Sequence, residues 1–195
     1  MEIAPIILSG KVVRLEPLSE SHAPDLTVAA QDERIWQYML YGYLDNVEKM
    51  LALVRDLLDR QANGTDLPFA VIHLASGRAV GMTRYLEIRR EHSSMEIGGT
   101  WYATEYQRTA VNTECKYLLL KHAFETLGCI RVQFKADVRN VNSIRAIERL
   151  GAMREGVLRN HIITPDGTIR DSVYFSILDR EWAGVKRRLE EKLAR

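Results

Sequence analysis

The stretch MEIGGTWYATEYQRTAVNTEC, residues 95–115, decides how the fold is interpreted. It begins with a segment rich in β-forming residues, 95–103, and continues through a polar loop that contains no glycine. The pattern after the loop predicts a helix over about residues 112–127 that Gly128 ends. The strand-like segment IRVQFKAD, residues 130–137, follows at once. A strand, a helix and a strand joined so closely favour a right-handed crossover between parallel strands.

The chain before this unit predicts further strands and helices. Residues 68–75 and 79–89 are rich in β-forming residues and are separated by turn signals, so we expect an antiparallel meander with residues 95–103. Nearer the N-terminus, a first strand ends at Pro17, and a helix is expected near residues 20–30.

Three more helices complete the predicted order. One begins after Asp45, because Asp45 can cap it and apolar residues recur at three- and four-residue spacing up to Gly64. Residues 141–151 predict a short helix. Two strands then flank the turn TPDG, residues 164–167, and a charged helix begins at about Asp179.

Composition indicates one globular domain over residues 1–195. Hydrophobic residues make up 46% of the 195 residues, enough for one sizeable core, and no repeat or linker interrupts the chain. The 27 Lys plus Arg nearly balance the 26 Asp plus Glu, which argues against nonspecific binding to nucleic acid or to a membrane. The N-terminus has no basic segment before its apolar residues, and no apolar run approaches about 18 residues, so we expect a cytoplasmic protein.

The two cysteines indicate no special site. Cys115 and Cys129 have no CxxC spacing and no histidine at metal-ligand distance. We therefore expect neither a disulfide framework nor a bound metal. Cys115 also lies on the predicted inner face of its helix, where it is poorly placed as a nucleophile.

The start of the 112–127 helix raises the question of an anion site. The first turn of any helix presents about four backbone N–H groups without intrahelical partners, together with the positive end of the helix dipole. A phosphate would fit there, but capping by Asn112 or Thr113 explains the polar residues equally well. No glycine is present; Ala110 allows close approach but disfavours a positive φ, whereas Asn112 tolerates one.

Three longer stretches carry a family resemblance. They are residues 95–114, 122–152 and 155–182, and in order and spacing they resemble the GCN5-related N-acetyltransferases, in particular the RimJ/RimL-type branch. The resemblance covers nearly the whole chain. It implies an α/β fold whose mixed central sheet is splayed between its fourth and fifth strands, with acetyl-CoA as cosubstrate in the gap.

The resemblance assigns residues to acetyl-CoA. A Q/R-x-x-G-x-G/A loop of the family binds pyrophosphate through main-chain amides, and both of its glycine positions differ in this chain. The family's pantetheine arm pairs with main chain as an added strand would, and it contacts an asparagine, here Asn140, unless Asn140 is simply a turn residue. In that arrangement Asn142 caps the helix. Arg145 either reaches the 3′-phosphate or is an exposed helix arginine. The expected contacts are Gln107, Arg108, Thr109, Ala110, Val111, Asn112 and Thr113 for the pyrophosphate, and Trp101, Tyr102 and Ala103 for the arm.

Transfer to an amine also needs a base and a proton for the departing thiolate. Glu96 is the first candidate base by family position, although it can equally be a solvent-facing strand carboxylate. His161 is the alternative base unless it is structural. Many relatives protonate the thiolate with a tyrosine where this chain has Ile147, so Ser143 inherits that role by resemblance, although serine is also common in a first helical turn.

The resemblance also implies how the carbonyl is polarised and where the acceptor binds. A main-chain amide near Tyr102 or Ala103 would polarise the thioester carbonyl. An aromatic cluster before the second long helix either lines an acceptor pocket or packs into the core; its members are Trp36, Tyr38, Tyr41 and Tyr43.

Two functions follow from these residues. The first is direct N-acetylation of a primary amine, on a small molecule or a protein N-terminus, within a ternary complex. The second is a non-catalytic acyl-CoA-binding protein with a regulatory or scaffolding task, which the missing tyrosine and glycines would favour. The acceptor and the preferred acyl-chain length are not legible from the sequence. Homodimers are common among such enzymes, but the sequence identifies no interface.

Overall fold

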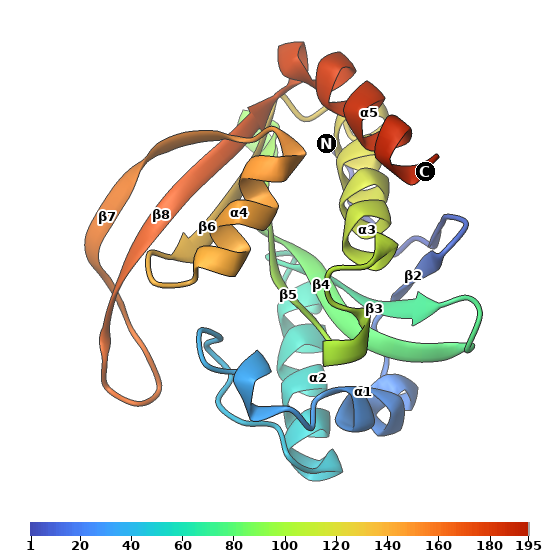
Figure 1. Cartoon of the computed structure of the whole chain (residues 1–195), viewed down its shortest axis with the longest axis vertical. Helices are drawn as coiled ribbons and strands as arrows, with labels where there is room; N and C mark the ends of the chain where they lie inside the picture. Colours follow the sequence, from blue (N-terminus) through green and yellow to red (C-terminus); the bar gives the residue numbers. More distant parts are fainter. Residues whose placement is uncertain (195) are drawn as a thin grey trace.

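The computed structural model describes residues 1–194, and one mixed sheet forms its centre (Figure 1). The strand order is β1-β2-β3-β4-β5-β6-β8-β7. Neighbouring strands run antiparallel except β5 and β6, which run parallel. The strands are β1 (Leu8–Ser9), β2 (Val13–Pro17), β3 (Leu67–His73), β4 (Arg78–Arg89), β5 (Ser94–Tyr102), β6 (Arg131–Asp137), β7 (Met153–Ile163) and β8 (Ile169–Leu178).

Helices cover both faces of this sheet (Figure 1). Helices α1 and α2 pack on one face, against side chains of β3, β4 and β5. Helices α3, α4 and α5 pack on the other face, over the larger part of the core. A single π-helical turn, His122–Thr126, extends α3. The helices are α1 (Ala23–Ala29), α2 (Val47–Ala62), α3 (Ala110–Lys121), α4 (Val141–Leu150) and α5 (Asp179–Leu193).

The predicted order of elements is confirmed, with one addition. Strands β3, β4 and β5 form the expected antiparallel meander, and β6 is the strand after the long helix. The parallel pairing of β5 and β6 confirms a crossover between parallel strands. The short strand β1, which pairs with β2, is absent from the sequence prediction because two residues carry no periodic signal.

Two predicted helix caps are wrong, that of α2 by one residue and that of α3 by three or four. Asn46 caps α2, with its side-chain oxygen accepting from the Lys49 amide, whereas Asp45 forms an ion pair with the Lys49 ammonium. Thr109 caps α3, so this helix begins at Ala110, and neither Asn112 nor Thr113 is its cap. Adjacent polar residues have similar capping propensities, and the path of the chain decides which one is used.

Strands β5 and β6 separate after a short paired region. Their pairing ends at Glu96 and Gln133. Beyond this point β5 continues to Tyr102 and β6 to Asp137. The expected separation between the fourth and fifth predicted strands is therefore confirmed, and one main-chain edge of β5 loses β6 as its partner.

Alternation along β6 and β8 gives this part of the sheet two different faces. Apolar residues of both strands enter the core beneath α3, α4 and α5, for example Val132, Phe134 and Phe175. The residues between them point to the opposite side, which we call the polar face. It includes Glu96 on β5, Gln133, Lys135 and Asp137 on β6, and Ser172, Tyr174 and Ser176 on β8.

A buried carboxylate joins α3 to the N-terminal strands. Glu114 accepts hydrogen bonds from the main-chain N–H groups of Lys11, Val12 and Val13 at 2.8, 2.7 and 2.7 Å. A Cβ at Gly10 would overlap this carboxylate, so the tight approach requires glycine there. These contacts fix the position of α3, and with it the start of that helix.

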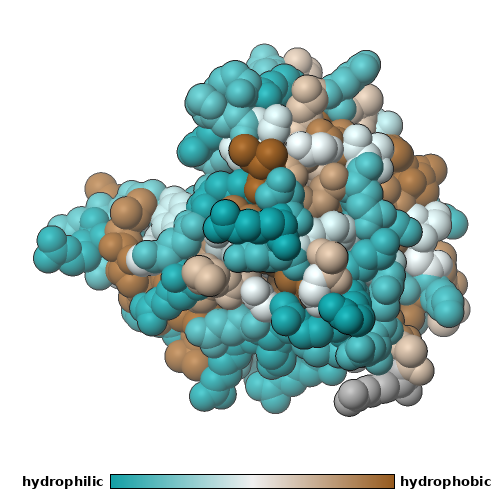
Figure 2. Space-filling view, turned by 90° about the horizontal axis from the view of Figure 1, so that it is seen from above, coloured by the Kyte–Doolittle hydropathy of each residue, from teal (hydrophilic) through white to brown (hydrophobic). Residues whose placement is uncertain are grey.

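The surface seen in Figure 2 is mostly hydrophilic, with small and separate apolar patches. Scattered patches of this kind are ordinary on a folded domain. Among the described residues, the helices lack the length and the apolar composition that crossing a lipid bilayer requires.

Candidate active site

Glu96 lies where β5 leaves β6, and its side chain is almost completely buried. The residue is 2% exposed, so the interpretation of Glu96 as a solvent-facing carboxylate is wrong. Its Oε2 accepts a hydrogen bond from Gln133 Nε2 at 3.0 Å, and its Oε1 lies 3.5 Å from Lys135 Nζ. Burial raises the pKa of the Glu96 carboxyl, although the charge of Lys135 and both contacts oppose that rise.

A chain of polar contacts continues from Glu96 to His161. Lys135 Nζ lies 5.8 Å from the centre of the Tyr174 ring, and the Tyr174 hydroxyl lies 3.4 Å from His161 Nε2. His161 Nδ1 lies 3.0 Å from the Ser172 hydroxyl oxygen. Burial lowers the pKa of His161, which favours its neutral form. The structure therefore brings both predicted bases to one face of the sheet and connects them.

A bulge in β5 leaves room beside Glu96. The pairing of β4 and β5 changes register around Gly99, which has a φ of +57°. A Cβ at Gly99 would lie 2.7 Å from the Tyr41 hydroxyl oxygen and 3.0 Å from Arg84 Nε. A Cβ at Gly98 would lie 3.0 Å from Glu96 Oε1. Glycine at both positions therefore keeps the carboxylate and the Tyr41 hydroxyl close to the main chain of β5.

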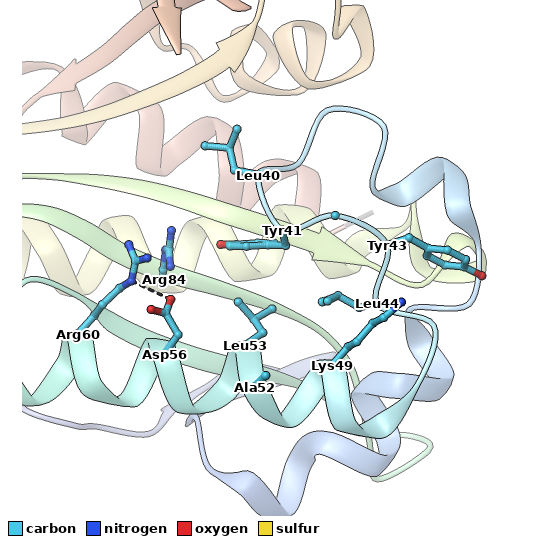
Figure 3. Close-up of a pocket in the computed structure, with 11 residues that line it drawn as sticks. Leu40, Tyr41, Tyr43, Leu44, Lys49, Ala52, Leu53, Asp56, Arg60 and Arg84 are labelled. Atoms are coloured by element: carbon cyan, nitrogen blue, oxygen red, sulfur yellow. Dashed lines mark hydrogen bonds and ion pairs between the residues drawn. The ribbon is translucent and has the colours of Figure 1, made fainter. Parts of the chain in front are cut away.

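A cavity of about 510 Å³ lies between α2 and residues 40–44 (Figure 3). Leu40, Tyr41, Leu44 and Leu53 give it apolar walls. Charged side chains of Asp56, Arg60 and Arg84 gather at one end, where Arg60 Nε donates to Asp56 Oδ2 at 2.9 Å. Because Tyr41 and Arg84 also adjoin Gly99, the inner wall of the cavity reaches the bulge in β5.

Arg84 is a buried cation with spare hydrogen-bonding capacity. Its Nη1 lies 3.2 Å from Asp66 Oδ2, and its Nε has no hydrogen-bond partner among residues 1–194. The guanidinium lies 5.7 Å from the centre of the Tyr41 ring. A polar group that entered the cavity would therefore meet an unsatisfied donor.

The aromatic cluster divides between the core and this cavity. Trp36 is buried and packs on Trp101, with ring centres 5.0 Å apart. Tyr41 and Tyr43 line the cavity. The Tyr38 ring lies 6.0 Å from the Arg139 guanidinium. Core packing is therefore confirmed for Trp36, whereas the role of the cavity lined by Tyr41 and Tyr43 as an acceptor pocket stays a prediction.

The loop before α3 is shaped by Thr109 and by one left-handed residue. The Thr109 hydroxyl donates to the Tyr106 carbonyl at 2.7 Å and accepts from the Val111 amide at 3.3 Å. Arg108 has a φ of +60°. Ala110 and Asn112 lie inside the helix, so neither needs a positive φ. The two departures from glycine therefore cause no backbone strain.

Exposure around this helix start is favourable for an anion. Gln107, Arg108, Thr109 and Ala110 are exposed, and Asn112 and Thr113 are partly exposed. Val111 is buried, and its amide donates to the Thr109 hydroxyl oxygen. The remaining N–H groups of the first turn have no intrahelical acceptor. The geometry is suited to a phosphate, as the positive end of the helix dipole lies at the same place.

Asn140 caps α4, which corrects the expectation that Asn142 does so. The Asn140 side-chain oxygen accepts from the Ser143 amide at 3.0 Å, which leaves only the side-chain NH₂ for a ligand. Ser143 is half-buried in the first turn, and Arg145 is exposed. Ile147 is buried in the core, as an apolar replacement for a tyrosine should be.

The end of β5 has one engaged and one open main-chain edge. The Ala103 amide donates to the Val80 carbonyl at 2.9 Å, so that amide is not free to polarise a thioester. In an antiparallel pair alternate residues point their N–H groups to opposite edges, so the Tyr102 amide faces away from β4. The Tyr102 carbonyl accepts from Gln107 Nε2 at 3.1 Å. The side chains of Trp101 and Tyr102 are both buried.

Several residues of the site are missing from the sequence prediction. Gln133, Lys135 and Tyr174 surround Glu96 and His161, yet no motif contains them. The alternation of polar and apolar residues in strand 130–137 is the one signal that could have identified the first two. No group of three or more His, Cys, Asp or Glu side chains within residues 1–194 is arranged to hold a metal ion. Burial raises the pKa of the Cys115 thiol to about 12, which makes it a poor nucleophile.

Comparison with known proteins gives consistent matches. The model of the acetyltransferase (GNAT) domain matches residues 13–153. A crystal structure from T. thermophilus, provisionally described as an acetyltransferase, is 38% identical and has a TM-score of 0.90, covering 99% of this chain and 100% of that chain.

Two further relatives match less closely. YdaF of Bacillus subtilis (strain 168), provisionally named a ribosomal N-acetyltransferase, is 34% identical over 113 residues. This match spans 58% of the present chain and 61% of YdaF, less than two thirds of that relative. RimJ of Mycobacterium smegmatis, solved with CoA-disulfide, is 21% identical with a TM-score of 0.80, covering 97% of this chain and 93% of that chain. At this identity the likeness to RimJ shows a shared fold.

Proposed function

Because the chain belongs to the acetyltransferase (GNAT) family, we propose that it moves an acetyl group directly from acetyl-CoA to a primary amine. The family makes the chain an acyltransferase, and no comparison supports a non-catalytic acyl-CoA-binding protein. The observation that carries the proposal is the buried Glu96 carboxylate at the separation of β5 and β6. A buried carboxylate with a raised pKa beside an open strand edge has the properties of a general base.

The chemistry begins with the amine. At neutral pH a primary amine is mostly protonated, and Glu96 takes a proton from it, directly or through one water. The neutral nitrogen attacks the thioester carbonyl carbon and the new C–N bond forms. The nitrogen then releases its second proton to water, the C–S bond breaks, and the electron pair leaves on sulfur. A main-chain amide on the open edge of β5, with Tyr102 as the candidate, polarises the carbonyl. His161 is the second candidate base, because Tyr174 and Lys135 link it to Glu96.

The residues present fit acetyl-CoA. The exposed first turn of α3, with Gln107 to Thr113, supplies N–H groups for the pyrophosphate. The pantetheine arm runs along the open edge of β5 and meets the Asn140 side-chain NH₂. Ser143 reaches the sulfur from the α4 side, and the exposed Arg145 meets the 3′-phosphate.

The acceptor approaches β5 from the side of α2, away from the phosphate-binding start of α3. The cavity between α2 and residues 40–44 reaches Gly99, and its size suits a small amine or the first side chain of a polypeptide. Both a small molecule and a protein N-terminus are therefore retained as acceptors. The provisional name of YdaF, a ribosomal N-acetyltransferase, makes protein N-termini the first acceptors to test.

Calorimetric titration with acetyl-CoA, and with CoA that lacks its 3′-phosphate, tests the proposal. We expect micromolar binding of acetyl-CoA, which Ala110→Glu should abolish by placing a carboxylate at the start of α3. Ala183→Glu, at an exposed alanine near the start of α5, is the matched control and should bind normally. Absent binding by the unchanged protein, or equal binding by Ala110→Glu, would contradict the assigned site.

A further inference from the structure

Lys116 is a buried cation that the proposed chemistry leaves unused. It lies on α3, is 6% exposed, and its Nζ donates to the Thr100 hydroxyl oxygen at 2.6 Å. No carboxylate oxygen of residues 1–194 lies within 4.0 Å of this ammonium. An ammonium has three N–H donors, so two of them have no side-chain or main-chain acceptor among the described residues. Burying a charge in this way is costly unless an acceptor or an anion arrives.

The groups around Lys116 do not balance its charge. The ammonium can only donate, so the Thr100 hydroxyl oxygen accepts from it, and this oxygen also lies 2.8 Å from the Thr83 hydroxyl oxygen. The titratable group whose charge would act on Lys116 is Cys115 on the same helix, and Cys115 in turn interacts with Tyr102 on β5. Burial raises the pKa of both, so both are neutral and neither balances the charge of Lys116.

Lys116 and Glu96 lie on opposite faces of β5. Met95 and Ile97 of β5 enter the core beneath α3, so Glu96 between them points to the polar face. Lys116 comes from α3 itself and reaches β5 at Thr100, beyond the last residue pair with β6. A base on one side and a cation on the other side therefore flank the stretch of β5 that β6 has left.

This stretch is also where the thioester belongs. A pantetheine arm that begins at the start of α3 and runs back along β5 first passes Ala103. From Ala103 to Thr100 the distance along the strand is about 10 Å, at a rise of about 3.3 Å per residue. Its sulfur end therefore arrives beside the Lys116 ammonium. The amine meanwhile approaches from the side of Glu96 and the cavity.

We propose that Lys116 is a catalytic residue whose ammonium contacts the sulfur of CoA and balances the negative charge of the departing thiolate. This inference rests on the proposed function. When the C–S bond breaks, the electron pair stays on sulfur, next to a preorganised positive charge in a site shielded from water. The cation takes the place of the missing tyrosine, because Ile147 cannot donate a proton and the Ser143 hydroxyl carries no charge.

The ammonium remains the counter-ion of the thiolate until CoA leaves. Burial alone lowers the pKa of Lys116 to about 8, but a thiolate beside the ammonium stabilises its charged form, so Lys116 keeps its proton. The thiolate takes its proton from solvent as CoA departs.

Titration of the thiol of bound CoA, followed by the ultraviolet absorbance of its thiolate, tests this inference. We expect a thiol pKa at least about one unit lower in the complex than in free CoA. Lys116→Gln keeps a donor to Thr100 but removes the charge, so it should restore the ordinary thiol pKa and lower kcat at least about tenfold, with a smaller change in KM for acetyl-CoA. Lys116→Arg keeps a charge and should keep the lowered thiol pKa.

The control is Lys121→Gln, which removes an exposed lysine from the same helix and should behave as the unchanged protein. An ordinary thiol pKa in the unchanged complex overturns the role of Lys116 and leaves the proposed function intact, and it needs no variant to be folded. An unaltered thiol pKa in Lys116→Gln has the same meaning. Failure of the unchanged protein to bind CoA overturns the proposed function and this inference together.

Discussion

The Glu96 carboxylate lies 3.5 Å from the Lys135 ammonium, at the last residue pair before β5 and β6 separate. Lys135 belongs to β6, so the separation of the strands and the charge beside the base have a common origin. Burial raises the pKa of Glu96, and Lys135 limits that rise. Because of this balance, the buried Glu96 carboxyl can be ionised when the amine arrives and can then accept a proton from the amine.

Removing the carboxylate should stop most of the turnover. Glu96→Gln keeps the shape of the side chain but cannot accept a proton, so we expect kcat/KM for the amine to fall by about 100-fold or more. Steady-state rates of CoA release give the value. Acetyl-CoA affinity should stay the same in calorimetry. Glu91→Gln, at an exposed glutamate, is the control, and near-normal rates for Glu96→Gln would transfer the role of base to His161.

Lys135→Met should move the pH profile. The ionised form of Glu96 is the active base, so activity rises with pH through the pKa of this group. Loss of the cation raises that pKa further, and the acidic limb of kcat/KM against pH should move to higher pH. A profile measured beside Lys11→Met, which alters an exposed lysine, tests the direction. A move to lower pH would mean that Glu96 does not control the limb.

Substitution of Gly99, at the bulge in β5, should impair the reaction with the amine acceptor and leave the binding of acetyl-CoA unchanged. In Gly99→Ala the new methyl would lie 2.7 Å from the Tyr41 hydroxyl oxygen and 3.0 Å from Arg84 Nε. We expect kcat/KM for the amine to fall about tenfold or more while acetyl-CoA binding is kept. Both constants come from initial rates with each substrate varied in turn.

Gly77→Ala is a closely matched control for this variant. Gly77 has a φ of +67°, similar to the +57° of Gly99, but a Cβ there meets nothing within 4 Å. Both variants should lose about 1 kcal/mol of stability from the left-handed backbone, and only Gly99→Ala should lose activity. Equal losses of activity would mean that strain, and not contact with the cavity, is responsible.

Glu114 should contribute more to the free energy of unfolding than an exposed glutamate does. Glu114→Ala removes the acceptor of three main-chain N–H groups, one in a buried contact and two in partly buried ones, and we expect the free energy of unfolding to fall by about 3 kcal/mol. Urea denaturation followed by circular dichroism measures the change. Glu105→Ala, at an exposed position, should change it by less than about 0.5 kcal/mol, and a similarly small effect for Glu114→Ala would contradict the structure.

The order of elements was legible from the sequence because it depends on local signals. The alternation in residues 68–75, 79–89 and 95–103 and the stop signals at Gly128 and Gly151 each act within a few residues. The resemblance around residues 107–112 likewise predicts the phosphate loop from the order of its residues alone, and that assignment stays a prediction. Such signals can be recognised without knowledge of the rest of the chain.

Choices between neighbouring residues required the tertiary structure. Thr109, Asn46 and Asn140 are the caps in place of adjacent polar residues, because capping propensities of Asn, Asp, Ser and Thr are nearly equal and the incoming chain selects among them.

The chemistry of single side chains depended even more on the fold. In sequence, Lys116 and Lys121 are two lysines of one helix, yet Lys116 is buried against Thr100 and Lys121 is exposed. Glu96 is a base candidate by its strand, but its burial and the nearness of Lys135 arise where β5 and β6 separate. Sequence determines the order of local structures through short-range propensity, whereas the dielectric, the charge partners and the pKa of a group come from residues far away in the chain, which packing alone brings together.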